Sequence, residues 1–130
     1  MEALSIIIAD DNDLLRHVIK ACLETLRGVN ILTATNGIEA LNFMENMGEE
    51  TCLLITDHEM PGMTGDELIR KAKERFPKIK SILISGRLSQ REVDGLEEPF
   101  KPTFFLAKPF SAPAMVALVV KLLGDYMLGE

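Results

Sequence analysis

Length, composition and charge exclude several classes of protein. The 130 residues are 47% hydrophobic and 26% charged, as in a soluble globular domain whose core folds without disulfide or metal crosslinks. Fourteen Lys and Arg residues are scattered among twenty Asp and Glu residues and leave a net charge of -6. This balance shows no electrostatic footprint for DNA or RNA, so we expect no direct nucleic-acid partner.

The chain shows no feature of an exported or membrane protein. No apolar run approaches the roughly eighteen residues of a membrane span, and the amino terminus lacks the apolar stretch of a signal peptide. Cys22 and Cys52 stand apart in apolar surroundings without a CxxC pair. This arrangement indicates buried thiols in a reducing compartment and not a disulfide scaffold or a zinc site. We therefore expect a cytoplasmic protein with no membrane contact.

In chain order, five short apolar runs alternate with longer segments of helical periodicity. Residues 4–9, 30–33, 52–56, 81–84 and 103–107 have strand length and are rich in aliphatic or β-branched residues. After the first run, apolar residues at helical spacing predict one face of a helix that stops at Gly28, namely Leu14, Leu15, Val18, Ile19, Cys22, Leu23 and Leu26. Ranges 37–47, 65–76 and 111–127 predict further helices, and 89–96 predicts a short, weak one.

This alternation predicts an α/β fold with an open, doubly wound, five-stranded parallel sheet, (βα)5. The runs 6–8 and 53–55 are apolar without interruption, as required of strands that are covered on both faces. No repeat, low-complexity tract or Pro/Gly/Ser-rich linker interrupts the pattern. We therefore expect a single domain over residues 1–130, with a core at about 4–127 and no output domain.

Polar side chains follow four of the predicted strands at the point where each strand ends. Asp10 and Asp11 follow the first strand, Asp57 the third, Ser85 the fourth and Lys108 the fifth. Alone, each has an ordinary structural explanation, as a helix cap, a turn residue or a solvated lysine. In open α/β sheets, however, the functional crevice lies at these carboxyl ends. Three carboxylates gathered there repel one another unless a cation neutralises them.

The donor set favours a magnesium site and phosphoryl chemistry. Mg²⁺ prefers oxygen ligands and takes one or two carboxylates together with phosphate oxygens. An Asp carboxylate can attack a phosphoryl group and form an aspartyl-phosphate, and Asp57 is the natural nucleophile because its acidic neighbours would hold the metal. The metal and Lys108 would offset the charge, and the Ser85 hydroxyl would hydrogen-bond one phosphoryl oxygen.

Nearly the whole chain resembles the receiver domains of two-component response regulators. The matching motifs are Asp10-Asp11, Asp57 with Met60-Pro61 and Gly65, Ser85-Gly86, and Lys108-Pro109-Phe110. The resemblance implies a flavodoxin-like sheet in the order 2-1-3-4-5, known from a chemotaxis receiver, with Asp10 and Asp11 opposite Asp57. It also implies that a sensor histidine kinase or a phosphotransfer protein supplies the phosphoryl group.

The resemblance further assigns roles to individual residues of the site. Asp11, Asp57 and the backbone carbonyl of Glu59 would bind Mg²⁺ directly, and Asp10 would act through water. Lys108 would pair with the phosphoryl group. The peptide bond that follows Lys108 would be cis, which is a rare state for such bonds.

Residues beside the site are expected to control the switch. Activation in this family moves the hydroxyl at Ser85 toward the phosphate and turns the aromatic residue at Phe105 inward. The alternative that Phe105 is ordinary strand core stays open. Glu59 and Arg87 stand two residues after Asp57 and Ser85, respectively. We expect this oppositely charged pair to meet over the site and to slow the attack of water on the phosphorylated residue.

Surfaces away from the site predict protein partners. The segment 111–127 is apolar nearly all round, with Lys121 and Asp125 as its main charges. A helix of this kind offers an interaction surface when one side must face outward. We therefore expect a downstream protein target or a homodimer to bind through the fourth and fifth helices, 89–96 and 111–127.

Other functions are kept as alternatives to a phosphorylation switch. One is a receiver-like module that merely binds partners without being phosphorylated. Another is an aspartyl-phosphate phosphohydrolase with Asp57, His58 and Glu59 in its active site, although the short chain offers no cap domain. A flavodoxin-like electron carrier is disfavoured because the acidic segment 10–13 would repel a flavin phosphate. In the leading interpretation the chain is no enzyme in the turnover sense, and only assists its own phosphorylation and slow dephosphorylation.

Overall fold

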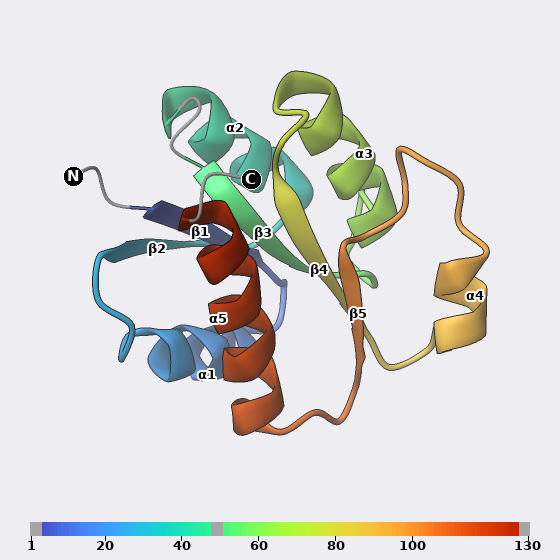
Figure 1. The fold of residues 1–130 in the computed structure, drawn as a ribbon. Helices are drawn as coiled ribbons and strands as arrows, with labels where there is room; N and C mark the ends of the chain where they lie inside the picture. The colour runs from blue at the N-terminus through green and yellow to red at the C-terminus, as the bar shows by residue number, and fades with distance from the viewer. Residues whose placement is uncertain (1–3, 48–50, 128–130) are drawn as a thin grey trace.

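Strands and helices alternate along the chain (Figure 1). The computed structural model describes residues 4–47 and 51–127. Within these ranges the elements are β1 (Leu4–Ala9), α1 (Asp13–Leu23), β2 (Val29–Ala34), α2 (Gly37–Met47), β3 (Thr51–Asp57), α3 (Gly65–Arg75), β4 (Lys80–Ser85), α4 (Gln90–Asp94), β5 (Phe104–Ala107) and α5 (Ala112–Met127). The predicted (βα)5 order is confirmed.

The strands form one parallel sheet in the order β2-β1-β3-β4-β5. This is the open, doubly wound, flavodoxin-like order that the resemblance implies. Helices α1 and α5 cover one face of the sheet, and α2, α3 and α4 lie toward the other (Figure 1). The order reverses at β1, because the chain first runs outward to β2 and then returns to β3 on the other side. Functional side chains of open α/β sheets gather at the carboxyl ends of the strands at such a reversal.

Alternate residues of the central strands pack into two separate apolar layers. Ile7, Leu54 and Leu83 belong to the layer that contains buried residues of α2 and α3. The other layer contains buried residues of α1 and α5, together with Ile6, Ile8, Leu53, Ile55, Ile82 and Ile84. Because side chains alternate along a strand, a run that is buried on both faces has no polar position. This explains the uninterrupted apolar runs of the sequence.

The first helix ends earlier and buries a narrower face than the sequence predicts. α1 ends at Leu23, so that Leu26 lies beyond the helix. Ile19 and Leu23 are buried, but Leu14 and Val18 have exposed fractions of 75% and 44%. A helix that lies on a sheet buries only the stripe of residues that touches the sheet. The predicted apolar face of α1 is wider than this stripe, so part of it stays in solvent.

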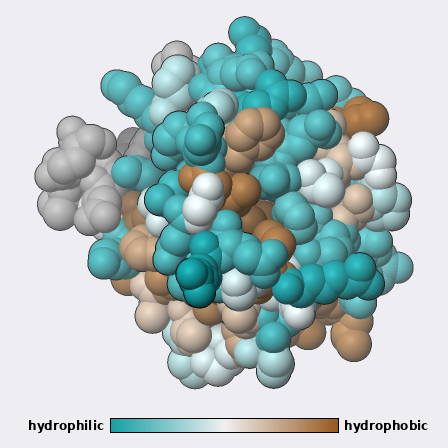
Figure 2. Space-filling view, turned by 90° about the vertical axis from the view of Figure 1, so that its right-hand side faces the viewer, coloured by the Kyte–Doolittle hydropathy of each residue, from teal (hydrophilic) through white to brown (hydrophobic). Residues whose placement is uncertain are grey.

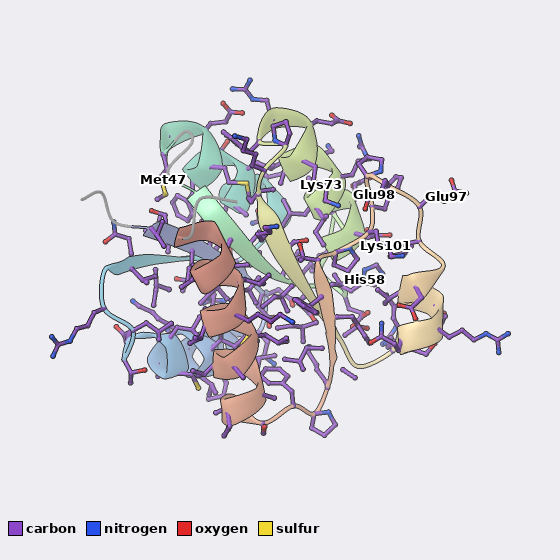
Figure 3. The ribbon with its side chains drawn as sticks, viewed as in Figure 1. Met47, His58, Lys73, Glu97, Glu98 and Lys101 are labelled. Carbon is purple, nitrogen blue, oxygen red and sulfur yellow. The ribbon has the colours of Figure 1, made fainter. Side chains whose placement is uncertain are left out.

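The fourth helix is short, as predicted, and the loop after it is held against α3. α4 begins with a capping box in which the side chains of Ser89 and Glu92 each accept from the backbone N–H of the other. Lys73 on α3 reaches the loop that precedes β5 (Figure 3). Its Nζ donates to Glu98 Oε1 at 2.6 Å and to the carbonyl of Lys101. Side chains of α3 therefore fix the path of this loop.

Up to residue 124, most apolar side chains of the last helix face the core. Met115, Val119 and Leu122 are buried against the sheet, whereas Val120 has an exposed fraction of 49%. Across the described part of the chain, the length and hydropathy of the helices fall short of what crossing a membrane requires. The outward side of α5 therefore offers a small apolar surface around Val120.

Candidate functional site

Three carboxylates meet where β1 and β3 end. Asp10 directly follows β1, Asp11 stands in the turn into α1, and Asp57 is the last residue of β3. One oxygen of each carboxylate lies within 4.8 Å of the others. Asp10 and Asp57 are buried, with exposed fractions of 1% and 3%, whereas Asp11 is exposed. The structure thus brings together the three acidic residues that the sequence analysis singled out.

Backbone contacts hold Asp10 in place. Its N–H donates to the Ala34 carbonyl at 3.0 Å, and its Oδ1 accepts from the Asn12 N–H at 2.9 Å. Burial, aided by the charge of Asp57, raises the pKa of Asp10 to about 6, and the Asn12 N–H opposes that shift. The carboxyl group therefore lies in a position where its charged form is disfavoured.

Arg16 is a residue of the site that the sequence analysis missed. It is buried, and its guanidinium donates to the Asp10 carbonyl at 2.8 Å and to Asp13 Oδ1. These bonds tie the loop after β1 to α1. The available signal was helical spacing, because Arg16 shares the buried side of α1 with Ile19 and Leu23. A charged residue on that side requires a polar partner nearby.

An ion pair joins the end of β3 to the loop after β5. Lys108 Nζ lies 2.8 Å from Asp57 Oδ1. Burial raises the pKa of Asp57, and Lys108 opposes part of the shift. Burial lowers the pKa of Lys108, but the contact with Asp57 outweighs it and leaves that pKa raised. The expected nucleophile therefore lies beside a cation.

The hydroxyl at the end of β4 binds Glu59. Ser85 is fully buried, and its Oγ donates to Glu59 Oε2 at 2.7 Å. Arg87 is exposed and takes part in none of the ion pairs between side chains of the described residues. The predicted pair of Glu59 and Arg87 is therefore not formed in this structure, and their effect on the attack of water stays a prediction. The buried hydroxyl offers Glu59 a fixed donor, whereas an exposed guanidinium gains little from leaving water.

Backbone hydrogen bonds continue the sheet past the ends of its central strands. The His58 N–H donates to the Ile84 carbonyl at 2.8 Å, and the Lys108 N–H donates to the Ser85 carbonyl at 2.9 Å. These bonds join the segments that follow β3 and β5 to the last two residues of β4. Asp57, Ser85 and Lys108 are therefore placed by one continuous backbone network.

A close backbone contact requires glycine at the start of α3. The Gly65 N–H donates to the His58 carbonyl at 3.0 Å. A Cβ at this position would overlap the carbonyl oxygen of Asp57 and the side chain of Leu83. The glycine therefore lets α3 begin directly against the backbone of the expected nucleophile.

Two features of β5 and the segment after it bear on the resemblance. The peptide bond between Lys108 and Pro109 is cis, as the resemblance implies. Phe105 is half-buried and packs against the apolar layer on the side of α2 and α3. This packing agrees with strand core and with a role in switching alike, so the role of Phe105 stays a prediction.

The acidic cluster fits a hard divalent cation. Asp10 Oδ2 is buried and has no hydrogen-bond partner among the described residues. A buried carboxylate oxygen without a partner is costly unless a cation contacts it. The donors of the cluster are all carboxylate oxygens, which Mg²⁺ prefers. The residues present therefore fit the magnesium ion that the sequence predicts.

Comparisons with known proteins point to one family. A family model described as the response regulator receiver domain matches residues 6–120. Chemotaxis protein CheY1 of Helicobacter pylori strain J99 is 34% identical over 92 residues, which cover 69% of this chain and 73% of that protein. The crystal structure of a response regulator receiver domain protein from Clostridium thermocellum has a TM-score of 0.80 at 25% identity. That match covers 96% of this chain and 98% of the other.

Longer signalling proteins also contain a similar segment. Sensor kinase CckA of Brucella abortus is 32% identical over 120 residues, which cover 92% of this chain and 12% of the kinase. The chain spans between 12% and 15% of the length of three such sensor kinases. Since the family model covers most of the sequence and the fold and acidic cluster agree with it, the chain belongs to the family of response regulator receiver domains.

Proposed function

We propose that this receiver domain is a phosphorylation switch with Asp57 as its phosphoacceptor. The observation that carries the proposal is the buried Asp57 carboxylate, paired with Lys108 and within 4.8 Å of two further carboxylates. An oxygen of Asp57 attacks the phosphorus atom of a donor, and the bond from phosphorus to the leaving atom breaks. The leaving group keeps that electron pair. The product is an aspartyl-phosphate.

Residues around Asp57 balance the charge of the phosphoryl group. The three clustered carboxylates and the backbone carbonyl of Glu59 would hold Mg²⁺, which as a Lewis acid would draw negative charge from the phosphoryl oxygens. Lys108 pairs with one of these oxygens from the position that it already occupies beside the nucleophile. The Ser85 hydroxyl donates to another oxygen once it has left Glu59.

Phosphorylation changes which arrangement of the site is most stable. The phosphoryl group comes from a sensor histidine kinase or a phosphotransfer protein. Its contacts with Ser85 and Lys108 favour the arrangement in which the Ser85 hydroxyl has left Glu59. The inward turn of Phe105 then carries this change to the outer face of β5. Slow hydrolysis then resets the domain, so the chain acts as a switch and not as an enzyme with turnover.

The outer faces of α4 and α5 are the proposed docking surfaces for a downstream protein or a second copy of the chain. Figure 2 shows the side of the molecule that carries α4, which is largely hydrophilic around a small apolar area. Val120 adds an exposed apolar side chain on α5. A partner on these surfaces meets many polar groups, which favours a reversible complex.

Cys22 is a free thiol, which supports a cytoplasmic location.

Incubation with Mg²⁺ and acetyl phosphate, followed by mass spectrometry of the intact protein, tests the proposal. We expect a stable gain of one phosphoryl group on the wild type and none on Asp57→Ala. Rapid consumption of acetyl phosphate without a lasting gain in mass would indicate a phosphohydrolase. No reaction at all would indicate a module that binds partners without phosphorylation. Either of these two outcomes contradicts the proposal.

A further inference from the structure

Every hydrogen-bonding position of the Ser85 hydroxyl is occupied. A hydroxyl group has one hydrogen to donate and two lone pairs that accept. Ser85 Oγ accepts from the backbone N–H of Arg87 at 3.0 Å and from that of Leu88 at 2.9 Å. Its single hydrogen goes to Glu59 Oε2 across a distance of 2.7 Å. Ser85 therefore has no hydrogen left for a second acceptor while it binds Glu59.

Of the three partners of this hydroxyl, Glu59 is the one that can leave. The two N–H donors belong to the turn after β4 and move only with that turn. Glu59 is a half-exposed side chain on the loop after β3, so water replaces Ser85 as its donor and no unpaired charge is left buried. Ser85 is fully buried and needs a new acceptor. A phosphoryl oxygen on Asp57 would be that acceptor.

The charge of Glu59 also acts on the nucleophile. Burial is the main cause of the raised pKa of Asp57, and the nearby Glu59 carboxylate adds to it. A carboxylate in this position repels a phosphoryl group, which carries negative charge of its own. Two properties of Glu59 therefore oppose phosphorylation, namely its charge and its hydrogen bond with Ser85.

We infer that Glu59 is a positioning residue that holds the Ser85 hydroxyl in the unphosphorylated state, because the two side chains share the only hydrogen that Ser85 can donate. This inference rests on the proposed role of Asp57 as the phosphoacceptor. When the phosphoryl group arrives, the bond from Ser85 to Glu59 breaks and the same hydrogen is donated to a phosphoryl oxygen. Glu59 thus stabilises the resting arrangement and sets how readily the domain switches.

A double-mutant cycle on the affinity for beryllofluoride tests the inference. Beryllofluoride is a noncovalent analogue of the phosphoryl group, and calorimetry in the presence of Mg²⁺ gives its dissociation constant. We expect Glu59→Ala to bind it about tenfold more tightly than the wild type, which corresponds to one hydrogen bond to a charged group. In a Ser85→Ala background the same substitution removes only the charge. The gain should then fall to about threefold or less.

Equal gains in the two backgrounds would show that Glu59 acts through its charge alone and would overturn the inference. Glu24→Ala is the matched control, because Glu24 is an exposed carboxylate at the end of α1 away from the site. We expect that variant to bind beryllofluoride as the wild type does. If Glu59→Ala is unstable, Glu59→Gln replaces it, with a smaller gain since the amide oxygen still accepts from Ser85.

Nuclear magnetic resonance gives a second measurement, without ligand. The amide signals of Arg87 and Leu88 should shift in Glu59→Ala, because both N–H groups donate to the oxygen that has lost its acceptor. Unchanged signals would contradict the inference. A wild type that does not bind beryllofluoride would instead contradict the proposed function of Asp57. The two failures are therefore distinguishable.

Discussion

Asp10 is a carboxyl group that the fold removes from water without giving each oxygen a donor. Oδ1 accepts from the Asn12 N–H, but Oδ2 has no hydrogen-bond partner among the described residues. The pKa of about 6, raised mainly by burial, reflects this mismatch. Perturbed groups of this kind are typical of functional sites. A metal-free site therefore lowers the stability of the domain near neutral pH.

Asp10→Asn should stabilise the metal-free domain near neutral pH. The folded pKa of about 6 exceeds the ordinary value of 3.8, so the charged carboxylate opposes folding above that pKa. The penalty disappears as the pH falls toward the ordinary value. We expect a gain of about 1 to 2 kcal/mol at about pH 7, less than the full pKa shift implies because burying the asparagine amide also carries a cost. Urea unfolding in the presence of EDTA measures the gain.

The control for this prediction is Asp94→Asn, which also removes one carboxylate. Asp94 is exposed, and an asparagine still accepts from the side chain of Gln90. We expect no change in its unfolding free energy. A gain for Asp10→Asn that is as large at about pH 4 as at about pH 7 would contradict the role of ionisation.

At the level of elements, the start of α3 and the loop after α4 are fixed by different kinds of contact. Gly65 brings the backbone of α3 against the backbone of β3. The loop is held by long side chains, since Lys73 binds Glu98 and the guanidinium of Arg70 lies 5.7 Å from the centre of the Phe100 ring. Backbone atoms cannot move aside, whereas long side chains reorient. The two contacts should therefore respond differently to substitution.

Gly65→Ala should destabilise the domain by about 1 to 3 kcal/mol, because the added methyl group overlaps backbone atoms. It should also slow phosphorylation by acetyl phosphate, since the Asp57 carbonyl must shift. Urea unfolding and the mass assay measure the two effects. Gly124→Ala in α5 is the matched control: a Cβ there meets no atom within 4 Å, and we expect a gain of up to about 1 kcal/mol. Similar effects of both substitutions would contradict the steric explanation.

Lys73→Ala should loosen residues 95–103 with little effect on global stability. The Glu98 side chain has an exposed fraction of 69%, and exposed ion pairs contribute less than about 1 kcal/mol. Backbone amide hydrogen exchange should become several-fold faster in this loop and stay unchanged in β1 and β3. Lys78→Ala, at an exposed lysine nearby, should leave the exchange unchanged. Faster exchange along the whole chain would contradict a local role for Lys73.

For the molecule as a whole, sequence patterns predicted the sheet and the acidic cluster, but not the contacts between loops. Apolar runs and helical spacing are local, so the strands and helices could be recognised, while the strand order came from the resemblance. The bond from Ser85 to Glu59 joins residues 26 positions apart in the chain and depends on how two segments meet, which no local pattern encodes. Arg16 lies only six residues from Asp10, and its helical spacing indicates the buried side of the helix but not the carbonyl that it binds. Leu14 shows that a local pattern can also predict too much. Its helical spacing fits the core face, but the sheet does not cover it.

Mg²⁺ should stabilise the whole domain, because the cluster of carboxylates exists only in the folded state. At a concentration of about ten times the dissociation constant, we expect a gain of about 1.4 kcal/mol. A rise in the melting temperature with Mg²⁺ that EDTA reverses would measure it, and Asp11→Asn should reduce the rise. A melting temperature that does not respond to millimolar Mg²⁺ would contradict the magnesium site.

The hydrogen bonds from the His58 N–H to the Ile84 carbonyl and from the Lys108 N–H to the Ser85 carbonyl also determine how the site is lost. Both bonds end on the last two residues of β4, so opening of the end of β4 removes the support of Asp57 and of Lys108 in one step. We expect gentle heating to lower the fraction of molecules that acetyl phosphate can phosphorylate, because each molecule in which the end of β4 has opened lacks a formed site.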